Sequence, residues 1–202
     1  MDMAEDSRIY ELWLLCAMHR RETAPFVDAA LARLGATHAE MEQAAERHRE
    51  LTATFQGRLS AELELLSGAR IEGSRTEHGN LVVDRHRFAS WPEFEFEVEY
   101  DPAGHGWFPE RAEFVRAPGS TTPPGPPVPW AWSRDETLAQ YEVLREIDHW
   151  YPYHSFAVRD GAEEYLFVSF SCGLLQEVAP LEVLDGEPIE RPRNGGAPSG
   201  GS

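Results

Sequence analysis

The chain has 202 residues, of which 35 are acidic and 18 are basic, and its formal net charge at pH 7 is -17. Every basic residue is Arg, and a chain this acidic is not expected to bind nucleic acid, which requires clustered cations. The two cysteines do not make a disulfide framework, and no apolar run approaches the roughly 18 residues of a membrane span. Because the chain also starts with acidic residues, where a signal peptide is basic, we expect a soluble cytoplasmic protein without membrane contact.

The first third of the sequence is expected to be helical. Apolar residues recur at helical spacing over residues 8–22, and a second short helix follows. Thr37 and Glu40 then form a capping box ahead of a continuous apolar stripe, which predicts one long helix over about 38–66. A stripe of that length favours either packing across a sheet or a homodimer seam. Residues 1–69 are thus predicted to be a helical N-terminal region.

From about residue 70 the hydrophobic period changes from that of a helix to that of a strand. The pattern predicts a three-strand antiparallel meander with strands over 81–88, 93–100 and 107–116. The next segment, 117–129, is rich in proline, which fits neither a helix interior nor a central strand. It is therefore predicted to be an extended connector.

Beyond the connector, Ser133 and Glu136 form another capping box, and apolar residues at helical spacing predict a helix over 134–149. A hairpin is expected next, with strands at about 153–159 and 163–172 around an Asp-Gly turn. Because two strands and one helix are too few to form a stable independent domain, we expect this hairpin to complete the sheet of the meander.

The predicted fold class is α+β, with N-terminal helices packed on an antiparallel sheet and a C-terminal helix and β-hairpin. Residues 70–190 hold the sheet and are expected to form one domain with residues 1–69. The tail, 191–202, has the composition of a disordered segment.

Residues 91–100 carry the clearest pattern in the chain, because apolar side chains alternate with carboxylates. A strand here places the apolar side chains on one face and the carboxylates on the other: Glu93, Glu95, Glu97 and Glu99. Carboxylates two residues apart on a strand are roughly 6.5 to 7 Å apart, which is within the screening length of about 8 to 10 Å at cellular salt. Cations are therefore expected close to this strand.

The preceding strand supplies two such cations. If the first two strands of the meander pair so that their apolar faces align, Arg87 lies opposite Glu95 and Arg85 lies opposite Glu97. Exposed pairs of this kind contribute about 0.2 to 1 kcal/mol each. The remaining carboxylates of the second and third strands are then predicted to form an acidic surface: Glu93, Glu99, Glu110 and Glu113.

An acidic surface and a strongly negative net charge favour a basic protein or peptide partner. A solvated sheet face without a partner is the alternative. No nucleotide-binding or catalytic motif occurs, so we expect a non-enzymatic binding protein that uses no cofactor. In general character such a protein resembles the immunity and antitoxin proteins that neutralise a basic enzyme. A homodimer through the helix over 38–66 is a further alternative.

Two aromatic groups add candidate binding residues, one before and one after the predicted helix over 134–149. Large aromatic side chains with polar tips are typical both of binding surfaces and of core edges, and they can enclose a cation such as Arg. The members of the two groups are Trp130, Trp132, His149, Trp150, Tyr151, Tyr153 and His154. Nothing in the sequence brings the two groups together.

An enzyme with a site between sheet and helices is the alternative function. Its best metal ligands are Asp84 and His86, which face the same way on one strand, and a third ligand is sought among His78, His149 and His154. A Cys172 thiol beside His154 is the candidate nucleophile, but no nearby cation in the sequence lowers its pKa. Because neither set shows the dense spacing of an established motif, no metal site and no catalytic residue is predicted.

Overall fold

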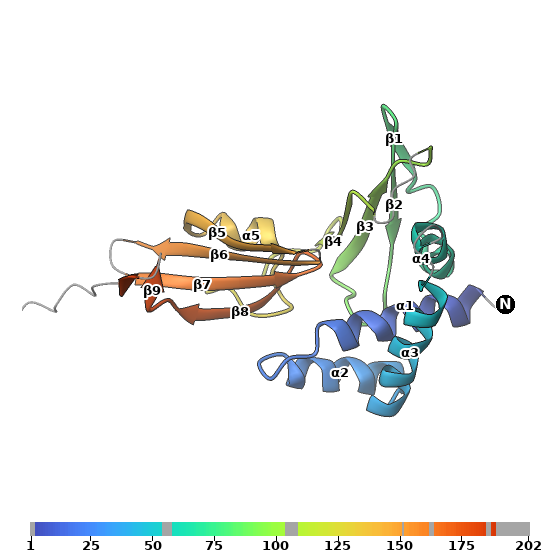
Figure 1. Cartoon of the computed structure of the whole chain (residues 1–202), viewed down its shortest axis with the longest axis horizontal. Coiled ribbons are helices and arrows are strands. Elements are labelled where there is room, and N and C mark those ends of the chain that lie inside the picture. Colours follow the sequence, from blue (N-terminus) through green and yellow to red (C-terminus); the bar gives the residue numbers. More distant parts are fainter. Residues whose placement is uncertain are drawn as a thin grey trace, which may run out of the picture.

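The protein is described here from a computed structural model, which places residues 3–53, 58–103, 109–150, 152–161, 164–184 and 187–188. Within these ranges it is mixed α+β, as predicted (Figure 1). The N-terminal helices lie against one antiparallel sheet, and a second antiparallel sheet extends away from them with one short helix beside it. No helix among the described residues is long and apolar enough to cross a membrane.

Four helices and one 3-10 turn form the N-terminal region, and α1 packs against α3, α4 and the turn η1. Their bounds are α1 Met3–Ala17, α2 Ala24–Leu34, α3 His38–Leu51, α4 Arg58–Leu66 and η1 Ser67–Ala69. The capping box predicted before α3 is confirmed, because the Glu40 backbone N–H donates to Thr37 Oγ1 and the Thr37 backbone N–H donates to the Glu40 carboxylate.

The long helix predicted over 38–66 is not formed as one element. α3 ends at Leu51, and the hydroxyl of Thr52 donates to the carbonyl of His48 at 2.8 Å. A Thr hydroxyl that bonds the preceding turn competes with continuation of the helix. The stripe is thus divided between two helices, and its buried apolar members, Met41, Ala44, Leu65 and Leu66, pack inside the chain. The homodimer stays a prediction.

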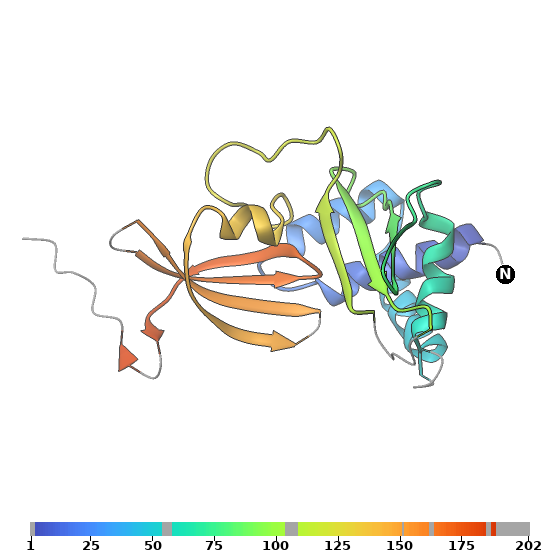
Figure 2. The same cartoon turned by 90° about the horizontal axis from the view of Figure 1, so that it is seen from above.

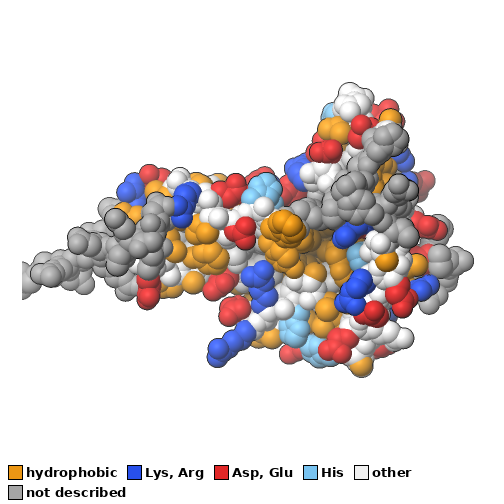
Figure 3. All heavy atoms as spheres, in the orientation of Figure 1, with side chains coloured by type: hydrophobic (Ala, Val, Ile, Leu, Met, Phe, Trp, Pro, Cys, Tyr) orange, Lys and Arg blue, Asp and Glu red, His pale blue; other side chains and the backbone are white. Residues whose placement is uncertain are grey.

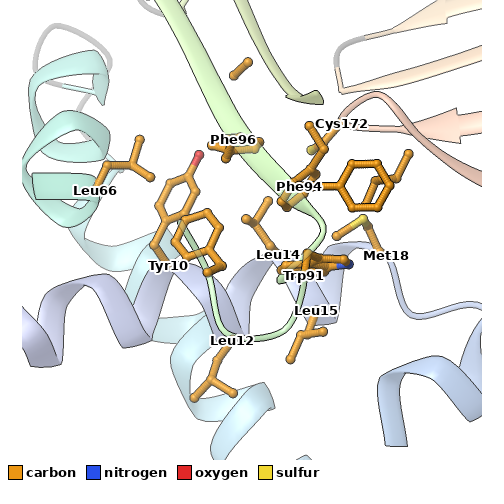
Figure 4. Packing of buried hydrophobic residues seen from close by; sticks show 14 of the residues in the cluster. Tyr10, Leu12, Leu14, Leu15, Met18, Leu66, Trp91, Phe94, Phe96 and Cys172 are labelled. Atoms are coloured by element: carbon orange, nitrogen blue, oxygen red, sulfur yellow. The ribbon is translucent and has the colours of Figure 1, made fainter. Parts of the chain in front are cut away.

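The first sheet has the strand order β1-β2-β3-β4 and is antiparallel throughout. Its strands are β1 Thr76–His78, β2 Leu81–His86, β3 Phe94–Tyr100 and β4 Arg111–Arg116. The predicted register of β2 on β3 is confirmed, because Arg85 lies opposite Glu97 and the apolar faces of the two strands coincide. The apolar face of this sheet meets α1, and aromatic side chains from both pack together around Tyr10 and Phe96 (Figure 4).

The predicted helix over 134–149 is wrong beyond its first turns. The helix α5 spans only Arg134–Leu138, although its predicted capping box is present, and a strand, β5, occupies Glu142–Trp150. Two β-bulges in β5 explain the error, because each inserts one extra residue: Leu144 in the first and Ile147 in the second. As a result Val143, Glu146 and His149, each three residues from the next, face the same side of β5, and this spacing imitates that of a helix.

The second sheet has the order β5-β6-β7-β8, with β6 Tyr153–Asp160, β7 Glu164–Ser171 and β8 Leu174–Pro180. β6 and β7 are the predicted hairpin, but they pair with β5 and β8 and not with the meander. The expectation of one sheet is therefore wrong, because β5 supplies the strand that the hairpin was thought to lack. A short pair of strands, β9 Val183–Leu184 and β10 Glu187–Pro188, follows, and the predicted tail lies outside the described residues.

The two sheets meet at the turn between β7 and β8. Phe114 on β4 donates its backbone N–H to the carbonyl of Cys172 at 2.7 Å, and Arg134 donates its backbone N–H to the carbonyl of Gly173 at 2.7 Å. Figure 2 shows the proline connector, 117–129, running from β4 to the segment before α5 as a long loop. Cys172 also belongs to the hydrophobic core of the first half, beside Phe94 (Figure 4). The connector and this turn thus hold the two sheets together.

Candidate functional site

The alternating Glu residues of β3 lie in a network of ion pairs with Arg. Arg87 pairs with Glu95 at 2.7 Å, and Arg85 pairs with Glu97 at 3.0 Å, as the register requires. Arg111 on β4 contacts three carboxylates, which belong to Glu97, Glu99 and Glu113. Long Arg side chains cover these carboxylates, so that Glu95, Glu97 and Glu113 are buried.

The predicted acidic surface is therefore largely neutralised within the sheet. Glu113 also pairs with Arg134 at 3.0 Å, and only Glu93 and Glu110 among the six predicted carboxylates are exposed. On the face drawn in Figure 3, acidic and basic side chains are interspersed over both halves of the molecule.

The two aromatic groups have different positions. Trp130 and Trp132 are buried: the Trp130 indole N–H donates to Gln176, and Trp132 packs in the core of the second sheet. His149 and Trp150 end β5, where they lie opposite His154 and Tyr153 at the start of β6. Trp150 is 74% exposed, the most exposed large hydrophobic side chain among the described residues. Tyr151 lies outside the described residues.

A pocket of about 560 Å³ lies between β4 and the β5–β6 end of the second sheet. It brings together predicted residues that the sequence did not connect. Carboxylate, imidazole and indole groups line it, together with an Arg from α5: Glu110, Glu113, Arg134, His149, Trp150 and His154. Sequence reasoning missed this juxtaposition because it placed a helix where β5 lies and therefore separated the two groups.

Comparison with protein-family models, with curated proteins and with solved structures finds no match for this chain. The function is therefore argued from the geometry of the described residues.

Among the described residues, Asp84 and His86 do not come together with a third possible metal ligand. Asp84 accepts a hydrogen bond from the Tyr100 hydroxyl at 2.9 Å, and His86 Nδ1 donates to the carbonyl of Leu66 at 3.0 Å. Burial lowers the pKa of His86 to about 4, so its imidazole is neutral at pH 7. The proposed third ligand His154 belongs to the other sheet. Asp84 is thus held by the neighbouring strand β3, and His86 by the last residue of α4.

The Cys172 thiol is buried and has the wrong protonation state for a nucleophile. Burial raises its pKa to about 12, so the sulfur is a thiol at neutral pH. It belongs to the same hydrophobic core as Leu174 and Met18, where it acts as a small hydrophobic side chain.

Glu146, His149 and His154 form a cluster that the sequence analysis did not predict. Glu146 Oε1 lies 3.3 Å from His149 Nδ1 and 3.3 Å from His154 Nδ1, and one ligand atom from each of the three residues lies within 4.8 Å of the others. Burial lowers the pKa of His154, while its hydrogen bond with Glu146 opposes the shift. The only signal in the sequence is a Glu and a His three residues apart, which come to one face of β5 through a bulge that the sequence does not reveal.

Proposed function

We propose that the protein is a non-enzymatic binding protein that recognises a basic segment of a protein or peptide partner at the exposed end of β5. The observation that carries the proposal is Trp150, which is 74% exposed on an edge strand and lines the pocket. An exposed indole beside carboxylates attracts the guanidinium or ammonium group of a partner through cation–π and charge contacts.

Carboxylates accompany this indole on two sides. The register on β6 puts Asp148 and Trp150 on the same face of β5, opposite Ser155 and Tyr153, and Asp148 is exposed. Glu110 is also exposed and lines the pocket together with Trp150. A basic side chain can therefore contact an aromatic ring and a carboxylate at one place, while the net charge of -17 increases its rate of approach.

Recognition through side chains fits β5 better than addition of a strand to its free edge. The two bulges interrupt the regular spacing of backbone donors and acceptors along the strand. Bulged edges of this kind are a common protection against edge-to-edge pairing. Specificity for a basic partner thus comes from Trp150 and its neighbouring carboxylates.

Fluorescence anisotropy with a labelled oligo-arginine peptide tests the proposal, with an oligo-glutamate peptide of equal length as the negative ligand. Trp150→Ala is expected to weaken binding about two- to fivefold, the effect of losing an exposed cation–π contact. Asp148→Asn should weaken it as well, and high salt should weaken binding to every variant.

Glu77→Gln is the matched control, because it makes the same charge change as Asp148→Asn at an exposed position on β1 of the other sheet. It is expected to leave the affinity nearly unchanged. If Trp150→Ala and Asp148→Asn bound the peptide as tightly as this control, the end of β5 would not be the binding site.

A further inference from the structure

Glu146, His149 and His154 form a compact ligand set on β5 and β6. The carboxylate oxygen lies 3.3 Å from the Nδ1 atom of each imidazole, and the two imidazole ring centroids are 4.3 Å apart. Two ligands of a tetrahedral Zn²⁺, each about 2.0 to 2.1 Å from the metal, lie about 3.3 to 3.4 Å from one another. The oxygen–nitrogen spacings of the cluster therefore match those around a metal ion.

The second bulge of β5 creates this convergence. Side chains alternate along a regular strand, so residues 146 and 149 would otherwise point to opposite faces. Ile147 is the inserted residue, and the bulge returns His149 to the face of Glu146. His154 is directly opposite His149 on β6 and completes the set. Bulges often re-aim side chains at functional sites.

Exposure of the three side chains leaves the cluster accessible. The side chains of His149 and Glu146 are 64% and 42% exposed, whereas that of His154 is 17% exposed. A metal can thus enter from solvent, with His154 as the most firmly held ligand. Because both imidazoles also line the pocket, a coordination position not taken by the protein would lie next to that pocket.

We propose that Glu146, His149 and His154 bind a divalent transition-metal ion of the Zn²⁺ class and leave at least one coordination position open. Two imidazoles and one carboxylate suit Zn²⁺ and Fe²⁺, whereas Ca²⁺ and Mg²⁺ prefer oxygen ligands alone. The open position provides a place for a water molecule or for a donor atom of a bound ligand. This site does not rest on the peptide-binding proposal, since Zn²⁺ coordination by these three side chains requires neither a peptide nor Asp148, which lies on the opposite face of β5 from Glu146 and His149.

Isothermal titration calorimetry of the full chain with Zn²⁺, after removal of metals by a chelator, tests this site. We expect one Zn²⁺ per chain with a dissociation constant in the micromolar range or tighter, and no comparable binding of Mg²⁺. His149→Gln, His154→Gln and Glu146→Gln are each expected to weaken Zn²⁺ binding by at least about tenfold, because even loss of an outer-shell partner costs 10- to 100-fold. Zn²⁺ should also raise the unfolding temperature of the wild type but not of His149→Gln.

His78→Gln is the matched control, because it removes an exposed imidazole from β1 of the first sheet. It should bind Zn²⁺ as the wild type does. His149 is mostly exposed, so its variant is expected to fold and keeps the test decisive even where His154→Gln fails to fold. Zn²⁺ binding that is absent in the wild type, or equal in His149→Gln and wild type, would overturn the proposal and leave a hydrogen-bonded His–Glu–His cluster.

Discussion

His48 is a buried imidazole that lies flat against an indole ring. Its ring centroid is 3.8 Å from that of Trp13 at an interplanar angle of 6°, and the ring of Tyr10 meets it edge-on. Burial, with a smaller contribution from Arg58, lowers the pKa of His48 to about 4. Folding therefore favours the neutral imidazole, and protonation of this residue opposes folding.

This pKa predicts how acid affects stability. The folded pKa lies below the unfolded value of about 6.5, so the stabilisation is complete above pH 6.5 and is lost as the pH falls toward 4. A shift of this size amounts to about 3 kcal/mol of unfolding free energy. In His48→Phe, which retains a flat ring on Trp13, that part of the pH dependence should disappear.

Urea unfolding of both proteins at several pH values measures the effect. At pH 8 the two should be of similar stability, because the buried Nε2 of His48 has no hydrogen-bond partner among the described residues and Phe therefore loses no bond from that atom. Below pH 6.5 the variant should become the more stable one. A difference that stayed constant from pH 8 to pH 4 would contradict the lowered pKa.

At the scale of elements, Arg111 holds β3 and β4 together on their charged face. It contacts Glu97, Glu99 and Glu113, and two of these, Glu97 and Glu113, lie directly opposite each other in the β3–β4 register. Like charges in that position repel, so the guanidinium between them is needed for the pairing. One planar group with several donors suits this role in a way that Lys does not.

Arg111→Met is expected to lower the unfolding free energy by about 2 to 4 kcal/mol, somewhat below the range for a fully buried ion pair because Arg111 is partly exposed. Adding Glu113→Gln to this variant should restore less than about 1 kcal/mol, because it removes the repulsion from Glu97 but also the ion pair of Glu113 with Arg134. Arg49→Met, at an exposed pair with Glu46, is the control and should cost less than about 0.5 kcal/mol. Equal losses of unfolding free energy in Arg111→Met and Arg49→Met would show that the ion pairs of Arg111 stabilise the fold no more than one exposed pair does.

The elements also show why the sequence predicted some features and not others. The ion pairs of Arg85 and Arg87 follow from strict alternation, since the buried apolar face allows one register of β2 on β3. The cluster of Glu146, His149 and His154 could not be predicted, because a bulge changes which residues share a face. The same bulges gave β5 a helical spacing and so hid both the strand and the pocket beside it.

At the scale of the whole molecule, the arrangement of the two sheets depends on the tight turn at Cys172 and Gly173. Both residues have positive φ, and their carbonyls accept hydrogen bonds from β4 and from the start of α5. The number of sheets could not be read from the sequence, because strand periodicity says which residues face a core but not which strands pair across a long connector. The capping boxes and strand alternation are local signals, whereas this junction joins residues far apart in the chain.

Gly173→Ala tests whether this turn holds the halves together. A Cβ at Gly173 would lie 2.8 Å from Glu113 Cβ and 3.2 Å from the carbonyl oxygen of Phe114, so it would push β4 away from the second sheet. Gly161→Ala is the matched control, because Gly161 also has a positive φ but meets nothing within 4 Å. The control should cost about 1 to 2 kcal/mol of unfolding free energy from backbone strain alone. Gly173→Ala should cost about 1 to 3 kcal/mol more, and equal losses measured by urea unfolding would mean that the contact between the sheets is not tight.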